Sequence, residues 1–131
     1  MRRITTMPAN PTVTGVDHVQ ITIPLGSEDA ARAFYLDFLG LTEVPKPETL
    51  VGRGGFWMRA GGLAIHVGTE PVWDRSQTRA HVAFAVEDVD AWRVAFSEAG
   101  HDVIESVAIP GRDRFESRDP FGNRIEFISL A

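Results

Sequence analysis

The sequence contains no cysteine, which excludes disulfide bonds, thiolate metal sites, iron–sulfur clusters and cysteine nucleophiles. No apolar run approaches the roughly 20 residues of a membrane-spanning helix, and residues 1–8 lack the apolar stretch of a cleaved secretion signal. Basic residues are fewer than acidic ones, 13 against 18, so the net charge is −5. Nucleic acids and anionic membranes favour a basic surface. We therefore expect a soluble, cytoplasmic protein with neither nucleic acid nor membrane as a partner.

The 131 residues, of which 44% are apolar, suffice for one domain with a buried core. Within this single domain, 1–131, we expect a loose leader over 1–12, because Pro8, Asn10 and Pro11 prevent regular structure there. The rest of the chain repeats one pattern twice. The repeat predicts a first module over 13–69 and a second module over 79–131.

Each module opens with a segment in which apolar and polar residues alternate, over 16–23 and 79–86, and both segments are predicted strands. A helix with an apolar stripe follows each strand. Ser27 and Asp88 are the expected N-caps, and Gly40 and Gly100 mark the helix ends. Further extended segments are expected over 55–59 and 63–67, and over 103–109, 114–118 and 124–129. The pattern predicts an α+β fold built from two βαβββ modules.

Four side chains with metal-ligand chemistry occupy matched positions in the two modules. His18 and His81 lie near the start of the first strands, 63 residues apart. The last strands contribute His66 and Glu126, which follow these histidines by 48 and 45 residues. All four lie on the polar side of their strands, opposite the apolar residues. If a pseudo-twofold axis relates the modules, the four side chains can converge in one cavity.

Imidazole and carboxylate groups together suit a divalent transition metal, so we expect one divalent metal ion per site: Fe, Ni, Co, Zn or Mn. Two histidines and one carboxylate leave coordination positions open for substrate or oxygen. A fourth ligand, His66, favours Lewis-acid action on bound oxygens instead. The alternative is that these residues are ordinary cavity side chains, each hydrogen-bonded to a neighbour.

Three further residues are candidates for a substrate pocket. Alternation over 56–59 places Trp57 and Arg59 on the same face of a strand. Trp57 can wall a pocket, and Arg59 or Arg114 can hold a carboxylate or phosphate, with ordinary packing as the alternative for each. His101 follows the second helix in a turn, where we expect a solvent-exposed side chain.

Four motifs occur in order along the chain: Asp17-His18-Val19, FYLDFLGL over 34–41, Ala80-His81-Val82 and DPFGNRIEF over 119–127. With these motifs, residues 14–131 resemble the vicinal oxygen chelate superfamily. This superfamily includes glyoxalase I, fosfomycin-resistance thiol transferases, extradiol dioxygenases, methylmalonyl-CoA epimerase and bleomycin resistance proteins. The resemblance implies that the paired modules form a curled mixed sheet around a metal cavity, with the helices outside.

The resemblance also implies a role for each matched residue. His18, His81 and Glu126 match the common metal triad of the family. His66 falls where glyoxalase-like members carry a fourth ligand, usually Glu or Gln, so it is either a metal ligand or an acid–base group. Glu126 can bind the metal and also act as the catalytic base. Because such modules pair within one chain or between two, we expect a homodimer.

Three functions are compatible with the resemblance. We favour a metal-dependent enzyme that acts on a small oxygen-rich or carbonyl substrate as an isomerase or lyase, through a metal-bound enediolate. The second is an Fe(II) extradiol-type dioxygenase, and the third is a non-catalytic drug-binding protein like those of bleomycin resistance. Residues 19–23 contain no arginine, whereas glyoxalase-type enzymes carry one there for glutathione. This absence argues against a glyoxalase I in the strict sense.

Overall fold

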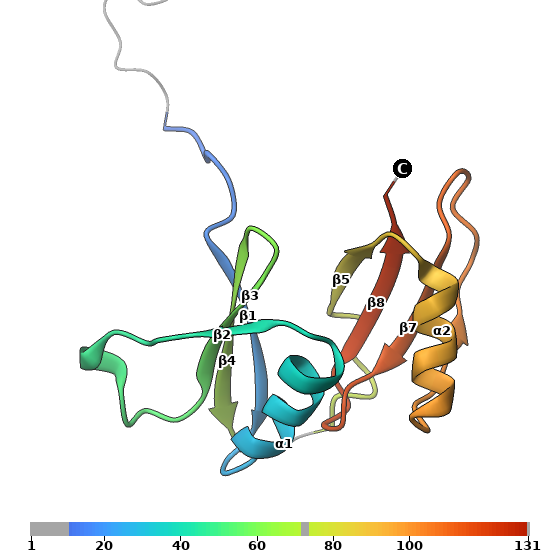
Figure 1. The fold of residues 1–131 in the computed structure, drawn as a ribbon. Helices are drawn as coiled ribbons and strands as arrows, with labels where there is room; N and C mark the ends of the chain where they lie inside the picture. The colour runs from blue at the N-terminus through green and yellow to red at the C-terminus, as the bar shows by residue number, and fades with distance from the viewer. Residues whose placement is uncertain (1–10, 72–73, 131) are drawn as a thin grey trace, which may run out of the picture.

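The computed structural model of the chain describes residues 11–71 and 74–130. The first ten residues of the predicted leader 1–12 therefore lie outside the described residues. Two four-stranded sheets stand side by side (Figure 1). The strands of one sheet have the blue and green colours of the first half of the chain, and those of the other have the yellow to red colours of the second half. Among the described residues, no helix is long and apolar enough to cross a membrane.

The first module consists of a strand, a helical segment and three further strands. In chain order these are β1 (His18–Pro24), α1 (Glu28–Arg32), the π-helix η1 (Ala33–Phe38), β2 (Thr42–Val44), the 3₁₀ helix η2 (Glu48–Leu50), β3 (Phe56–Ala60) and β4 (Leu63–Glu70). The order in the sheet is β1-β4-β3-β2, with β1 parallel to β4 and the other pairs antiparallel. The predicted βαβββ module is confirmed.

The second module repeats this arrangement. Its elements are β5 (His81–Val86), α2 (Val89–Glu98), β6 (Ile104–Glu105), β7 (Arg114–Arg118) and β8 (Arg124–Ser129). The order is β5-β8-β7-β6, again with a parallel pair, β5 and β8, at one edge. The strand predicted over 103–109 is shorter than expected: β6 ends at Glu105, and Ile109 forms only an isolated bridge to Arg112 across the turn at the left-handed Gly111 (φ 80°).

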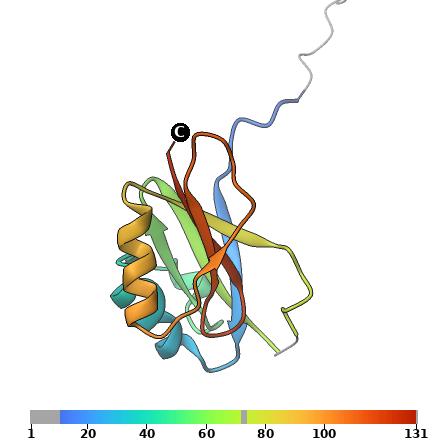
Figure 2. The same ribbon diagram turned by 90° about the vertical axis from the view of Figure 1, so that its right-hand side faces the viewer.

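Both helical segments lie on the same side of the two sheets, which leaves the other sheet faces uncovered (Figure 2). Strands β1 and β5 form the facing edges of the two sheets, but no hydrogen-bond ladder joins them within the described residues. The α+β class, the two modules and the outer position of the helices agree with prediction. Within the described residues the strands form two four-stranded mixed sheets, one for each module.

The helix boundaries agree with the sequence in all but one detail. Asp88 caps α2, since its Oδ1 accepts a hydrogen bond from the backbone N–H of Ala91 at 3.0 Å. Gly40 and Gly100 adopt positive φ angles of 82° and 81° at the two helix ends, as predicted. Ser27 does precede α1, but its hydroxyl donates to the carbonyl oxygen of Pro24 and so caps no helical N–H.

The core joins the two modules through aromatic side chains. Phe34 and Phe38 of η1 contact the ring of Phe96 in α2, with centroid distances of 6.2 and 5.1 Å. His101, expected to be exposed, is half-buried, and its ring packs on all three of these phenylalanines. The expectation was wrong because the turn after α2 folds back over the aromatic cluster. Edge-to-face packing of this kind adds to the apolar burial that holds the modules together.

A buried polar contact also links the modules. Tyr35, fully buried in η1, donates from its hydroxyl to Oδ2 of Asp119 at 2.6 Å. Asp119 accepts two backbone N–H bonds within the turn before β8, from Phe121 and Asn123. The amide of Asn123 then donates to the carbonyl oxygen of Thr22 in β1, at 2.8 Å. Burial, with the charge of Asp119 second, raises the pKa of Tyr35 well above its ordinary value, so the phenol remains the donor.

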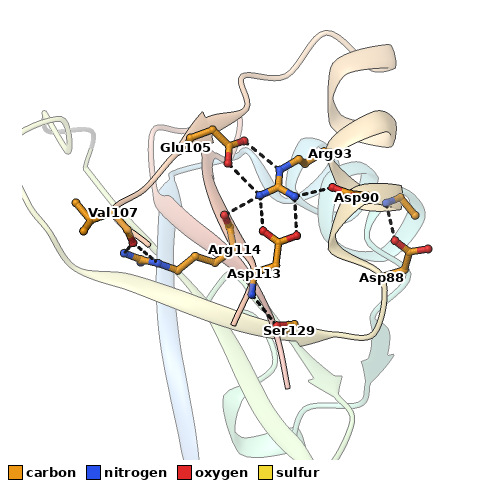
Figure 3. A network of polar contacts seen from close by, with 9 residues as sticks. Asp88, Asp90, Arg93, Glu105, Val107, Asp113, Arg114 and Ser129 are labelled. Atoms are coloured by element: carbon orange, nitrogen blue, oxygen red, sulfur yellow. Dashed lines mark hydrogen bonds and ion pairs between the residues drawn. The ribbon is translucent and has the colours of Figure 1, made fainter. Parts of the chain in front are cut away.

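In the second module, the guanidinium of Arg93 forms hydrogen bonds with three carboxylates (Figure 3). Arg93 of α2 donates to Asp90, Glu105 and Asp113 at distances between 2.7 and 3.0 Å, and to the carbonyl oxygen of Arg114. These hydrogen bonds raise the pKa of Arg93, and the bond from Arg93 lowers the pKa of Asp113. The network fastens α2 to the strands β6 and β7.

The buried phenol predicts a clear stability effect. Tyr35→Phe keeps the ring but removes the donor, which leaves Asp119 buried with one partner fewer. We expect the free energy of unfolding to fall by about 1–3 kcal/mol, as measured by urea denaturation. Ser97→Ala removes a hydroxyl from an exposed position of α2 and should change stability by less than about 0.5 kcal/mol. Equal effects of the two substitutions would contradict the structural role of the Tyr35–Asp119 bond.

The Arg93 network predicts an acid-dependent contribution to stability. Because the native pKa of Asp113 is lowered, the contribution is complete above the unfolded-state pKa, about 4, and is lost as the pH falls through the native pKa. In Arg93→Gln we therefore expect the free energy of unfolding to fall less steeply than in the wild type as the pH drops below about 4. Urea denaturation over this pH range measures the effect. Arg53→Gln, at an exposed loop position, has the same change in net charge and is the control. If the free energy of unfolding of Arg93→Gln varied with pH as it does in the wild type, the stabilising role of the Arg93–Asp113 bond would be overturned.

Candidate functional site

The four predicted metal-ligand residues lie on the sheet faces that the helices leave uncovered. The residues on either side of His66 in β4 and of Glu126 in β8 are buried in the core, so these two side chains point the other way. The side chains of His18 and His81 are 41% and 34% exposed, whereas that of Glu126 is 6% exposed. The alternation read from the sequence therefore placed all four on the expected face.

His81 and Glu126 form a hydrogen-bonded pair across the parallel strands β5 and β8. Nδ1 of His81 lies 2.9 Å from the carbonyl oxygen of Arg79, and Nε2 lies 3.0 Å from Oε1 of Glu126. A carbonyl oxygen only accepts, so the bond to Arg79 places a proton on Nδ1 and leaves Nε2 to face Oε1. An imidazole lone pair and a carboxylate oxygen at this distance need a cation between them, either a proton or a metal ion.

The geometry of this pair fits a divalent metal. Two donor atoms at right angles on an ion with bonds of about 2.1 Å lie about 3.0 Å apart, and the Nε2–Oε1 distance is 3.0 Å. Metal-binding histidines almost always donate their other N–H to an oxygen acceptor, as His81 does to Arg79. The second module thus offers two neighbouring side chains with metal-ligand chemistry, His81 and Glu126.

Glu126 is held on its other side by Arg114. Nη1 of Arg114 lies 3.3 Å from Oε2 of Glu126, and Nη2 donates to the carbonyl oxygen of Val107 at 2.6 Å. The guanidinium is therefore engaged with the candidate ligand itself and with the backbone, whereas the sequence suggested a direct contact with a substrate anion. The arrangement leaves Oε1 as the oxygen that faces His81.

A second carboxylate, Glu116, lies directly opposite Glu126 in the β7–β8 register and is only 8% exposed. Arg124 donates to Glu116 at 2.7 Å, and this bond lowers the pKa of Glu116. The two arginines offset the repulsion between two glutamates side by side. The sequence analysis did not identify Glu116 as a site residue. Because side chains alternate along a strand, its position next to the core residue Phe115 indicates that it points to the opposite face.

In the first module, the predicted residues form a stack of three rings. His66 packs face to face against Trp57, with centroids 3.9 Å apart and planes 2° apart, and its other face packs on His18 at 3.9 Å and 19°. Nδ1 of His18 lies 2.9 Å from Oδ2 of Asp17, a bond that lowers the pKa of Asp17. Burial, with the charge of His18 second, lowers the pKa of His66. Because Nδ1 of His18 faces Asp17, Nε2 is the ring nitrogen of His18 that is left to bind a metal.

A cavity of about 640 Å³ opens beside this stack. Its lining combines the three rings with the loop between β2 and β3, and consists of Asp17, His18, Val44, Pro45, Leu50, Trp57, Arg59, Ala64 and His66. Trp57 and Arg59 thus share a cavity with two of the candidate ligands. Arg59 also donates to the carbonyl oxygen of Gly62 in the turn before β4.

One chain brings the four residues together only as two pairs. Strand β1 runs parallel to β4, downward in Figure 1, whereas β5 runs parallel to β8, upward in the same view. His18 and His81, each the first residue of its strand, therefore lie at opposite ends of the two facing edges. Within residues 11–71 and 74–130, no three metal-ligand side chains form a cluster able to hold an ion. Each module contributes a separate half of the expected ligand set.

Comparison with known proteins supports the relationship suggested by the motifs. The family model of the Glyoxalase/Bleomycin resistance protein/Dioxygenase superfamily matches residues 15–127. A glyoxalase family protein from Bacillus anthracis is 43% identical, with a TM-score of 0.84 over 93% of this chain and 99% of that one. No curated protein matches the chain significantly.

More distant structures share the fold. Lactoylglutathione lyase from Agrobacterium tumefaciens is 22% identical, with a TM-score of 0.68 over 91% of this chain and 96% of that one. The fosfomycin resistance protein FosX from Listeria monocytogenes, solved with Mn(II) and sulfate, is 15% identical, with a TM-score of 0.75 over 92% of this chain and 93% of that one. At these identities the likeness concerns the fold alone.

Proposed function

The chain belongs to the glyoxalase/bleomycin resistance protein/dioxygenase superfamily, and we propose that it is a metal-dependent enzyme acting on a small oxygen-rich or carbonyl substrate as an isomerase or lyase. The observation that carries this proposal is the pair formed by His81 and Glu126, whose facing donor atoms lie 3.0 Å apart. Sequestration of a drug requires no metal-ligand set, whereas this chain retains ligand-type residues in both modules. The Mn(II) in the FosX structure supports a divalent ion in the same fold.

His18, His81 and Glu126 are the proposed ligands, and the ion is Fe, Ni, Co, Zn or Mn. Both histidines present Nε2, because Nδ1 is engaged by Asp17 in one case and by the Arg79 carbonyl in the other. When bound, the ion supplies Lewis-acid polarisation of substrate oxygens. Imidazole and carboxylate donors are compatible with every metal in this group.

The cavity beside the three stacked rings of the first module is the proposed substrate site, and it supplies the groups that bind and deprotonate the substrate. His66 presents an imidazole beside the proposed ligand His18, and its lowered pKa keeps the ring neutral and able to accept a proton. Arg59 contributes a positive charge to the same lining. In this assignment the first module holds and deprotonates the substrate, while Glu126 and His81 of the second module hold the ion.

We further propose that a second copy of the chain completes the site. One chain places its two pairs of ligands at opposite ends of the facing strands, so the first module of one copy must meet the second module of another. Such a homodimer buries the uncovered sheet faces and the edges of β1 and β5, which pair with no further strand within the described residues. Two equivalent sites, each with ligands from both copies, follow from the twofold symmetry.

Metal analysis tests the proposed chemistry. Protein purified without chelator or affinity-tag metal should contain about one divalent ion per chain, and the His81→Ala and Glu126→Gln variants should retain less than about a tenth of it. Elemental mass spectrometry measures the content and identifies the element. His101→Gln, which removes a histidine outside the site, is the matched control. Absence of metal in the wild-type protein, even after reloading, would overturn the proposal in favour of a binding protein.

Mixing two inactive variants tests the shared site. His18→Ala damages the first module and Glu126→Gln the second, so neither homodimer should hold the ion. After subunit exchange, each mixed dimer regains one intact site, so metal content should recover to about a quarter of the wild-type value. A site built within one chain predicts no recovery. Mixing two samples of the same variant is the control for unspecific uptake.

A further inference from the structure

We infer that Trp57 is a positioning residue that keeps His66 out of the coordination sphere of the metal ion, so that His18 is the single histidine ligand from the first module. The inference rests on the proposed function, since it concerns the ligand set of that site. It decides between the two roles that the sequence leaves open for His66, ligand or acid–base group.

The ring planes supply the main argument. An imidazole nitrogen binds a metal along its lone pair, which lies in the plane of the ring, at about 2.0–2.1 Å. The rings of His18 and His66 are 3.9 Å apart with planes inclined by 19°. Planes at this separation and inclination meet roughly 10 Å from the rings, far beyond the length of a metal–nitrogen bond. While the stack persists, one ion can be bound by either ring but not by both.

The contacts of the two rings decide which one binds. His18 has the partner of a metal ligand, since the Asp17 carboxylate holds Nδ1 at 2.9 Å and leaves Nε2 free. His66 lies directly opposite Trp57 in the β3–β4 register, and the indole covers one of its faces with planes only 2° apart. To reach an ion bound by His18, His66 must turn out of this stack and lose its contact with the indole.

The consequence concerns the reaction. With three protein ligands, the ion keeps more positions open for substrate oxygens than it would with four. His66 stays uncoordinated in the lining of the cavity, where its nitrogen can hold or move a proton. Trp57 itself acts only through His66, by fixing the plane of that ring.

Cobalt(II) is the probe for the ligand count. In Co(II)-loaded protein with ¹⁵N-labelled histidine, each histidine ligand that carries a proton on Nδ1 gives one strongly shifted, exchangeable NMR signal. We expect two such signals in the wild-type protein and in His66→Ala, whose affinity for Co(II) should stay within about threefold of the wild type. His18→Ala should lose one signal and at least about tenfold in affinity.

Substitution of the indole tests the role of Trp57. In Trp57→Leu, His66 is released, so we expect a third shifted signal and tighter Co(II) binding. Trp57→Phe retains a ring to stack on and should restore the count of two. Circular dichroism and urea denaturation confirm that each variant is folded before its spectrum is interpreted.

The outcomes separate this inference from the proposed function. Three signals in the wild-type protein, or two in folded Trp57→Leu, overturn the role of Trp57 but leave the metal enzyme standing. No Co(II) binding to the wild-type protein overturns the proposed function, and the inference with it. Two signals in the wild type together with three in Trp57→Leu support both.

Discussion

The buried hydrogen bond between Tyr35 and Asp119 determines how the two modules lie relative to each other. No strand pairing connects the sheets within the described residues, so their mutual orientation depends on the aromatic cluster and on the polar contacts around Asp119. Aromatic packing alone tolerates sliding, whereas a hydrogen bond between two groups that are 0% and 4% exposed does not. Asn123 extends the contact to β1, and thereby fixes the facing edges that separate the two pairs of ligands.

Most of the fold could be predicted from the sequence because alternation and helix signals are local. The alternation around His18 and His81 identified the uncovered faces, and Gly40 and Gly100 marked the helix ends. Ser27 shows the limit of such signals, since its hydroxyl had a nearer acceptor in Pro24. How the two sheets meet depends on contacts between edges that lie far apart in sequence, and no local pattern reports whether one chain or two provide those contacts.

The candidate site was predictable to the same extent. Matched spacing identified the four ligand-type residues, since a repeated module places equivalent residues on equivalent strands. Their neighbours were not predictable, because they depend on strand register: Trp57 meets His66 across β3 and β4, and Glu116 meets Glu126 across β7 and β8. The engagement of Arg114 by Glu126 has the same origin.

The division of the ligands between two modules has a consequence for how the protein responds to its own concentration. Under the proposed assembly, metal binding and association of two copies are linked equilibria, so each strengthens the other by mass action. Dilution should release the ion, and abundant metal should hold the dimer together at low protein concentration. Occupancy of the site then depends on the amount of protein as well as on the supply of metal.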